Sequence, residues 1–365
     1  MANARATVER ALRAASARLP DLFAPGTRLV VAFSGGQDST TLLHGLRGFD
    51  LDLIAVHVDH ALRPESASDA QRVLELGVQI GVPGHVLRVD VPAYRRRQSV
   101  QAAARAARYQ ALAAAVTQLD ARALLMAHTA DDQAETLLLN LMRGTGLKGL
   151  AGMRLDDTID PRQLGPAVPE VGALPESVRV ARPLLRIARA TTLDYCVEAG
   201  LSFVADPSNQ SRAYTRNRVR LDVLPMLERF NPAIREVLAR TADLAADDEA
   251  ALDEVVSAVH ASLARASSAD ALEYDLRAWR QQPRGVQRRL LRRGLESLLG
   301  TLVDVPAAPI EDALDLVRSS QAGQAYHLPY GVELVTYRAT FTLRLHGAAR
   351  PRARTNIRGA AAPRV

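Results

Sequence analysis

The chain has 365 residues, of which 48% are hydrophobic and 24% are charged, so it is long enough to bury the cores of two domains. It contains no apolar run near the roughly 20 residues of a membrane span, and its first 20 residues lack the apolar core of a secretion signal. The single cysteine, Cys196, excludes an internal disulfide and a multi-cysteine metal or iron–sulfur site, and it favours a reducing cytoplasm.

The formal net charge is +6, and 45 of the 46 basic residues are arginine, with Lys148 as the single lysine. Codon usage in a GC-rich genome is one explanation for this preference for arginine. A positive balance of this size also suggests a polyanionic partner, such as a nucleic acid.

Strand and helix patterns alternate through the first half of the chain. Unbroken apolar runs predict buried strands, and apolar residues at helical spacing predict the helices between them. The strands are expected at 27–33, 51–60, 86–91, 121–129 and 178–185, and the helices at about 38–47, 66–80, 98–119, 131–142 and 188–199. This alternation predicts an α/β fold whose parallel sheet carries helices on both faces.

The pattern changes after about residue 214. Helical patterns dominate from there, and strand-like pieces return near the C-terminus, at YHLP, VELVTY and FTLRL. We therefore expect an α/β domain over 1–214, a mostly helical domain with short terminal strands over 215–346, and a basic, disordered tail over 347–365. Residues 155–177, rich in Pro, Gly and Asp, predict a surface insertion.

The stretch SGGQDS, residues 34–39, separates the first predicted strand from the first helix of the sheet domain. Gly35 and Gly36 allow the backbone to approach a ligand closely, and successive N–H groups with the helix N-terminus form a site for phosphate. Ser34 and Ser39 can donate hydroxyl hydrogen bonds to it. Asp38 suits such a site if Mg²⁺ lies between its carboxylate and the phosphate. The alternative is that Ser39 or Asp38 merely caps the helix.

SGGQDS lacks the lysine of the common P-loop and resembles the PP-loop of the N-type ATP pyrophosphatases, SGGxDS. Four further stretches, together with SGGQDS, resemble the tRNA(Ile)-lysidine synthetases. They are HVDHALRPESASDA (57–70), ARAARYQAL (104–112), AHTADDQAETLLLNLMRGTGLKGLAGM (127–153) and DPSNQSRAYTRNRVRLDVLP (206–225). The likeness covers about residues 28–225 and continues more weakly to about 345.

The resemblance implies a reaction that uses ATP and Mg²⁺. ATP activates C2 of the wobble cytidine, position 34, in the CAU anticodon of an isoleucine tRNA, with release of pyrophosphate. The amine of free L-lysine then attacks C2, AMP leaves, and lysidine forms. The oligomeric state stays open, with a homodimer among the options.

Three carboxylates open the helix after the strand 121–129. Asp131, Asp132 and Glu135 should face the same sheet edge as SGGQDS, where carboxylates can hold the ammonium of lysine or accept its proton. The alternative is that acids in a first helical turn only complement the helix dipole. The resemblance implies that all three bind lysine and that Asp132 is catalytic.

The remaining site residues also follow from the resemblance. It implies that Arg216 meets negative charge on phosphate oxygens during catalysis, and that Asp38 is a catalytic residue and the metal ligand. The residues expected to bind ATP are Ser34, Gly35, Gly36, Gln37, Asp38, Ser39 and His57. For His57, which lies at a strand end, ordinary packing is the alternative to a contact with adenine.

The basic residues expected to contact tRNA are Arg63, Arg105, Arg108, Lys148, Arg218, Arg284, Arg288 and Arg292. The last three recur every four residues on one predicted helix, where such a stripe can follow phosphates. For each of these arginines a solvated helix face is the alternative, and for Lys148 it is chance survival of one lysine.

Three other functions are compatible with parts of the sequence. A tRNA thiolase shares the PP-loop but needs cysteines to carry sulfur or a cluster. An amide-forming synthetase acting on a small molecule leaves the arginine stripe unexplained. A non-catalytic RNA-binding protein does not need SGGQDS with Asp131 and Asp132 intact.

Overall fold

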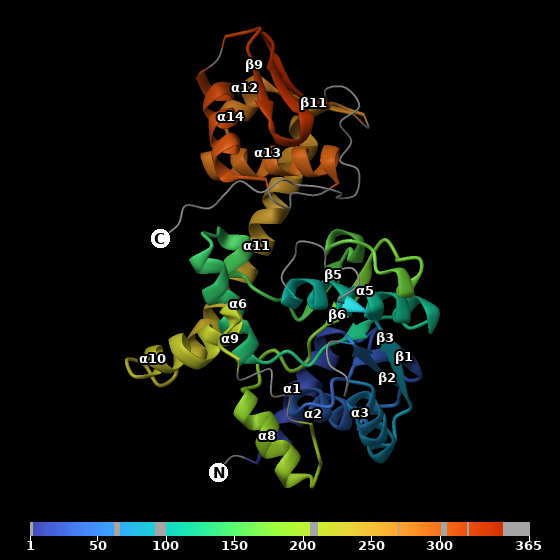
Figure 1. The fold of residues 1–365 in the computed structure, drawn as a ribbon. Coiled ribbons are helices and arrows are strands. Elements are labelled where there is room, and N and C mark those ends of the chain that lie inside the picture. The colour runs from blue at the N-terminus through green and yellow to red at the C-terminus, as the bar shows by residue number, and fades with distance from the viewer. Residues whose placement is uncertain are drawn as a thin grey trace. The chain divides into compact units, whose positions relative to one another are not determined.

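The computed structural model describes residues 3–61, 66–91, 100–204, 211–268, 270–300, 305–319 and 321–345. The chain divides into two compact units, Met1–Glu249 and Ala250–Val365 (Figure 1). Among the described residues, no helix is long and apolar enough to cross a membrane. The expected tail, 347–365, and Arg63 lie outside the described residues.

The first unit contains a six-stranded sheet with the strand order β3-β2-β1-β4-β6-β5. Neighbouring strands run parallel except for the edge pair of β5 with β6, which is antiparallel. The strands are β1 (Thr27–Ala32), β2 (Leu51–Asp59), β3 (Gly84–Arg88), β4 (Leu124–Leu125), β5 (Asp156–Ile159) and β6 (Val178–Ala181). The α/β class predicted from the sequence is confirmed, although β4 is much shorter than the apolar run around it.

Helices cover both faces of this sheet, as predicted. Val8, Leu42 and Tyr195 belong to a buried core on one face, and Ala107 and Leu112 belong to a second core on the other. The helices of the first core are α1 (Ala4–Arg18), α2 (Gln37–Leu46), α3 (Ser66–Ile80) and α8 (Arg189–Glu198), and α5 (Val100–Gln118) supplies much of the second.

Residues 155–177 are more closely integrated than the predicted surface insertion. They supply β5 and the short turns η1 (Pro161–Gln163) and η2 (Pro169–Val171). The buried amide of Gln110 holds this segment, because it accepts a hydrogen bond from the Val168 N–H and donates to the Pro166 carbonyl. Buried polar groups need such partners, so the segment is anchored against α5.

Helical structure after residue 214 packs first on the sheet unit. Val219 and Leu224 share a small buried core with Ala134 and Leu139 of α6 (Ala130–Met142). The change to a helical pattern predicted that 215–249 belong to the second domain, whereas these contacts group the residues with the first unit. The elements are α7 (Leu147–Leu150), α9 (Thr215–Arg218), the π-helical turn η4 (Val219–Val223), α10 (Leu224–Glu228) and α11 (Ile234–Leu263), which crosses into the second unit.

The described part of the second unit combines helices with a five-stranded antiparallel sheet, in the order β7-β8-β11-β10-β9. Its core is built around the fully buried rings of Tyr274, Trp279 and Phe341. The terminal strands were expected, whereas β7, β8 and α14 were not. The elements are β7 (Ala264–Ser267), β8 (Ala271–Asp275), α12 (Leu276–Arg280), α13 (Arg284–Leu299), α14 (Ala307–Ser319), β9 (Ala325–Leu328), η5 (Pro329–Gly331), β10 (Val332–Thr336) and β11 (Thr340–Leu345).

Candidate active site

The predicted catalytic residues come together at the carboxyl edge of the parallel sheet. The loop after β1 leads to β2 on one side, whereas β4 lies on the other side of β1, so the strand order reverses between β1 and β4. Ligands of open α/β sheets bind at such a reversal. The SGGQDS loop follows β1, the carboxylates of α6 follow β4, and α8 follows β6.

The SGGQDS turn has the geometry of a backbone cradle. Gly35 has a φ of +74°, and a Cβ there would lie 2.8 Å from Val73 Cγ2, so a side chain is excluded by both conformation and space. Gly36 is the N-cap of α2 and offers no side-chain cap to the first-turn N–H groups. The Ser39 hydroxyl donates to the Gly36 carbonyl at 2.9 Å and lies 3.2 Å from the Ser34 hydroxyl. This arrangement suits an anion at the start of α2.

Asp132 organises the first turn of α6. Its Oδ2 accepts hydrogen bonds from the N–H of Thr129 at 3.0 Å and from the Thr129 hydroxyl at 2.9 Å. Its Oδ1 accepts from Arg189 Nη2 at 3.0 Å and from Arg216 Nη2 at 3.3 Å. The carboxylate is therefore a helix cap on one side and an arginine ligand on the other.

Glu135 is completely buried and pairs with three arginines, of which Arg189 is the most distant at 3.8 Å. Its Oε2 accepts from Arg216 Nε at 2.7 Å, and its Oε1 accepts from Arg220 Nε at 2.6 Å. Asp131 in turn accepts from Arg235 Nη1 at 2.9 Å. Each carboxylate of the predicted lysine-binding set thus has an arginine partner, and an incoming ammonium has to compete with a guanidinium.

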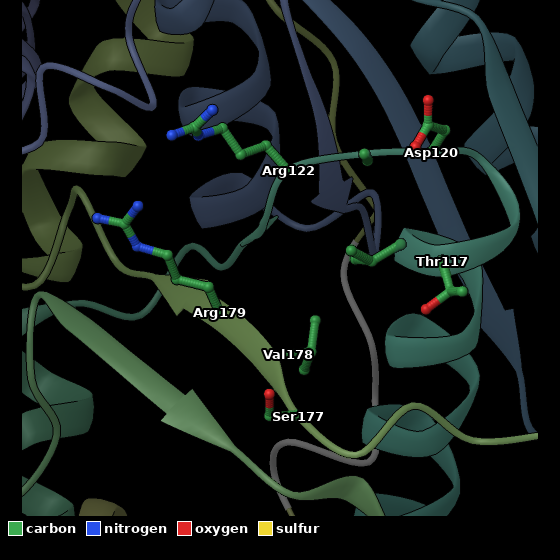
Figure 2. A pocket seen from close by; sticks show the side chains of 8 residues that line it. Thr117, Asp120, Arg122, Ser177, Val178 and Arg179 are labelled. Atoms are coloured by element: carbon green, nitrogen blue, oxygen red, sulfur yellow. The ribbon is translucent and has the colours of Figure 1, made fainter.

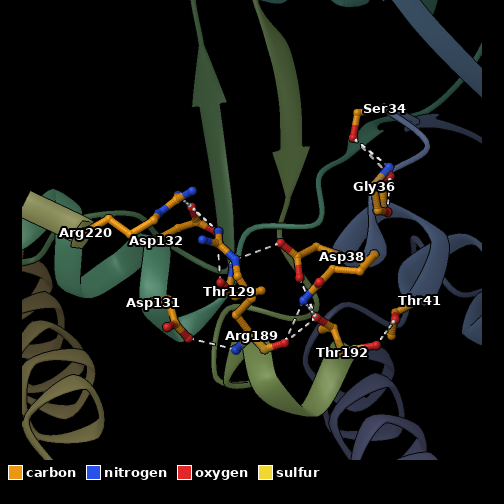
Figure 3. Close-up of polar contacts among 12 residues, drawn as sticks. Ser34, Gly36, Asp38, Thr41, Thr129, Asp131, Asp132, Arg189, Thr192 and Arg220 are labelled. Atoms are coloured by element: carbon orange, nitrogen blue, oxygen red, sulfur yellow. Dashed lines mark hydrogen bonds and ion pairs between the residues drawn. The ribbon is translucent and has the colours of Figure 1, made fainter. Parts of the chain in front are cut away.

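Arg189, at the start of α8, joins the two halves of the site (Figure 3). Its Nε donates to Asp38 Oδ2 at 3.1 Å, while its Nη2 reaches Asp132. The other Asp38 oxygen accepts a hydrogen bond from the Thr192 hydroxyl. Asp38 therefore faces α8 as well as the cradle.

The surroundings shift the pKa values of the two aspartates in opposite directions. Burial raises the pKa of Asp38 above its usual value, and the neighbouring Arg189 offsets only part of this effect. Burial also opposes ionisation of Asp132, but there the nearby arginines, Arg189 first, outweigh it and hold the pKa well below its usual range. Asp132 is accordingly a firmly ionised group.

The half-buried histidines at this edge, His57, His60 and His128, all have lowered pKa values, which favours their neutral form. Burial lowers the pKa of His57, whose Nδ1 lies 3.0 Å from the Phe33 carbonyl and must donate to it. The Nε2 of a neutral His57 ring is then an acceptor, which suits the amino group of a nucleobase. Burial lowers the pKa of His60 to about 4 and that of His128 to about 3.

Four of the basic residues expected to contact tRNA lie in the first unit and are exposed. Arg105 stacks on the Tyr109 ring with its guanidinium carbon 5.0 Å from the ring centroid, and Arg108 lies 3.4 Å from His60 Nε2. Both are exposed near the end of β2, and Lys148 and Arg218 are exposed elsewhere on the first unit. These positions leave their side chains accessible to a large ligand.

In the second unit, the predicted arginine stripe is partly neutralised. Arg284 pairs with Asp315 at 2.5 Å and with Glu311 at 2.9 Å, and Arg288 also pairs with Glu311. These pairs hold the pKa of Glu311 at about 2, with Arg288 as the main cause. Arg284 and Arg288 are therefore linked to α14, which differs from the free phosphate-tracking stripe that the spacing suggested.

Among the residues that the structure describes, no group of three or more His, Cys, Asp or Glu side chains is placed to hold a metal ion. Mg²⁺ is nevertheless often bound by one or two carboxylates together with substrate phosphates. The carboxylate of Asp38, beside the phosphate cradle, fits that donor set.

A separate pocket of about 260 Å³ lies at the opposite edge of the sheet (Figure 2). Its lining comes from residues just before β4 and from the start of β6, including Asp120, Arg122 and Arg179. Both arginines pair with Asp21. No residue of the predicted active site lines it.

Arg189 and Thr192 were missed by the sequence analysis. They occupy the first turn of a helix that follows a parallel strand, β6, and the carboxyl ends of parallel strands meet at one sheet edge. That rule, applied to the segment RIARATT, could have found them. No local motif marks them as functional.

Comparison with known proteins agrees with this geometry. Residues 6–227 match the PP-loop domain family. The chain is similar to a tRNA(Ile)-lysidine synthase of Dehalococcoides mccartyi, with 37% identity over 85% of this chain and 64% of the relative, and to one of Thermosynechococcus vestitus, with 35% identity over 85% and 84%. The chain belongs to the tRNA(Ile)-lysidine synthase family.

The matched range 6–227 of the PP-loop family includes the cradle, the carboxylates of α6 and the arginines of α9 and η4. The chain spans 64% of the length of the D. mccartyi synthase. A solved U34-tRNA thiolase of Methanococcus maripaludis with its [4Fe-4S] cluster has the same fold, with a TM-score of 0.52 and 17% identity over 66% of this chain and 78% of the thiolase.

Proposed function

We propose that this protein ligates free L-lysine to C2 of cytidine 34 in the CAU anticodon of an isoleucine tRNA, at the expense of ATP. The observation that carries the proposal is the meeting of the SGGQDS cradle and the α6 carboxylates at one sheet edge, bridged by Arg189. Family membership supports the same reaction. A cytoplasmic location and the oligomeric state stay predictions.

In the first step, O2 of the cytidine attacks the α-phosphorus of ATP and pyrophosphate leaves. Residues 34–39 and His57 would bind ATP, with the cradle around its phosphates and the His57 ring near its base. Asp38 would hold Mg²⁺, which neutralises charge on the phosphates when it is bound. Arg216 would stabilise negative charge that builds on the phosphate oxygens.

In the second step, the lysine ammonium loses a proton to solvent water and the free amine attacks C2. The C2–O2 bond breaks, and AMP leaves with O2. Asp131, Asp132 and Glu135 would hold the ammonium, each by exchanging an arginine contact for it. The lowered pKa of Asp132 makes it a weak base, so it suits holding the cation better than accepting its proton.

The tRNA would lie over the exposed basic residues of the first unit. Arg105, Arg108, Lys148 and Arg218 have accessible side chains there. Arg63 stays a predicted contact, as do Arg284, Arg288 and Arg292. Since Glu311 offsets the charge of Arg284 and Arg288, we expect Arg292 to contribute more per residue.

Mass spectrometry tests this function. An isoleucine tRNA transcript with a CAU anticodon, incubated with ATP, Mg²⁺ and isotopically labelled lysine, should gain one lysine less one water at nucleotide 34. A transcript with uridine at position 34 should stay unmodified. Pyrophosphate release without labelled tRNA, by a folded protein, would contradict the proposal.

The tRNA thiolase reaction is the alternative that the shared fold leaves. Cys196 is the single cysteine of the chain, is fully buried and lies 3.4 Å from the Thr41 hydroxyl. Replacement Cys196→Ser keeps its size, so the variant should incorporate lysine at the wild-type rate. Loss of tRNA modification in a folded Cys196→Ser protein would favour the thiolase.

A further inference from the structure

The guanidinium of Arg189 is shared between two sites that the proposed reaction keeps distinct. Its Nε binds Asp38, the predicted metal ligand, and its Nη2 binds Asp132, in the predicted lysine site. Its Nη1 lies 3.8 Å from Glu135 Oε1. One cation thus spans carboxylates from α2 and from α6 (Figure 3).

Both backbone polar groups of Arg189, its N–H and its carbonyl, are hydrogen-bonded to side chains of other helices. Its N–H donates to Asp131 Oδ2 at 2.7 Å, and its carbonyl accepts from Gln37 Nε2 at 2.9 Å. The backbone position therefore depends on both α6 and α2, and the part of the residue with freedom to change partners is its side chain.

A metal ion at Asp38 conflicts with the present contact of Arg189. Both oxygens of Asp38 are engaged, one by Arg189 and the other by Thr192. Mg²⁺ requires a direct oxygen ligand, and a dication repels a neighbouring guanidinium. Asp132 and Glu135 lie within reach of the same guanidinium, so Arg189 would stay paired after leaving Asp38.

We propose that Arg189 is a positioning residue that competes with the metal for Asp38 and moves fully to Asp132 and Glu135 when Mg²⁺ and ATP bind. Metal binding then places the positive charge of Arg189 entirely on the carboxylates of the lysine site. Nucleotide binding is thereby linked to the site of the second step. This inference rests on the proposed function, because that function supplies the metal role of Asp38.

Metal-dependent nucleotide binding tests the competition without turnover. The probe is α,β-methylene ATP, which resists cleavage between the α and β phosphates. Its binding to the full chain is measured by equilibrium dialysis at a series of free Mg²⁺ concentrations. The Mg²⁺ midpoint is the free Mg²⁺ concentration at which nucleotide binding is half-maximal. Arg189→Gln should lower this midpoint at least about fivefold, which is the lower end of typical coupling between sites. Asp132→Asn should raise the midpoint, because Arg189 then keeps Asp38 as its strongest partner.

Two control variants separate direct competition from general electrostatics. Arg216→Gln removes a cation that contacts Asp132 and Glu135, and no hydrogen bond or ion pair links Arg216 to Asp38 among the described contacts. Its midpoint should shift much less than that of Arg189→Gln.

Arg186→Gln removes an exposed partner of Asp243 in the same segment and should leave the midpoint unchanged. If Arg189→Gln fails to fold, Arg189→Lys takes its place in the test. A single ammonium cannot span both carboxylates, so this variant should give an intermediate shift of the midpoint.

The outcomes also distinguish this inference from the proposed function. An unchanged or raised midpoint in folded Arg189→Gln, or an equal shift in Arg216→Gln, would overturn the competition. If the midpoints move as expected while the wild-type protein attaches no lysine to tRNA, the competition holds and the proposed function fails.

Discussion

Single residues of this site carry more than one task, and Asp132 shows how their effects can be separated. It caps α6 through Thr129 and pairs with Arg189 and Arg216. Asp132→Asn keeps the size of the side chain and removes its charge. At saturating Mg²⁺ it should still release pyrophosphate in a single turnover, while lysine transfer should fall by about 10²-fold, because the lysine ammonium loses a charged partner and such a loss costs about 2–5 kcal/mol.

Rapid-quench assays with mass detection of adenylated tRNA measure both steps, and Asp243→Asn, in an exposed ion pair, is the matched control. Equal loss in the two steps would assign Asp132 to the metal or nucleotide instead. The pKa of Asp132 is lower in the folded protein than in the unfolded chain, where it is near 3.9. The charge of Asp132 therefore stabilises the folded protein above about pH 3.9, and this stabilisation is lost as the pH falls further. The variant should lack that acid-sensitive contribution.

At the scale of elements, the turn from β1 into α2 determines whether a phosphate can approach the helix. Gly35→Ala should destabilise the protein by about 1–3 kcal/mol and reduce ATP binding, because it combines a left-handed backbone with a Cβ 2.8 Å from Val73. Gly26→Ala is the control, since Gly26 has a φ of +73° with no atom within 4 Å of a Cβ.

Urea denaturation and equilibrium dialysis with ATP measure the two effects. The backbone strain is common to both variants, so the additional loss in Gly35→Ala reports the crowding against α3. Equal stability and ATP affinity of the two variants would show that the close approach to Val73 has no importance.

At the scale of the whole molecule, the two compact units can be followed separately. Trp279 is the single tryptophan of the chain and lies in the core of the second unit, so its fluorescence reports that unit. Glu311→Gln breaks the pairs with Arg284 and Arg288 and should lower the melting temperature of the Trp279 transition by about 1–5 °C at pH 7. The pKa of Glu311 is about 2 when folded, so this difference should shrink as the pH falls from about 4.3 towards 2.

Asp21→Asn is the control in the first unit, where Asp21 pairs with Arg122 and Arg179. It should leave the Trp279 transition at the wild-type temperature. A shift of that transition as large as the one in Glu311→Gln would contradict separate unfolding of the units.

The sequence by itself determined the features that depend on near neighbours. Apolar periodicity predicted the alternating strands and helices of the sheet unit, and the two glycines with the following helix predicted the cradle at 34–39. Both signals are local, because side-chain spacing and backbone freedom act within a few residues. The clustering of Asp131, Asp132 and Glu135 near that cradle followed from the rule that parallel strands end at one edge.

The tertiary structure decided which charged groups meet. Asp38 and Arg189 are 151 residues apart in the chain, and Arg288 and Glu311 are 23 apart on different helices. An exposed arginine and an arginine held by a buried carboxylate look the same in a sequence, because ion pairing depends on distance in space and leaves no periodic pattern. The short strands β5, β7 and β8 were not predicted from the sequence either, and they are recognised only by their pairing with neighbouring strands in the folded chain.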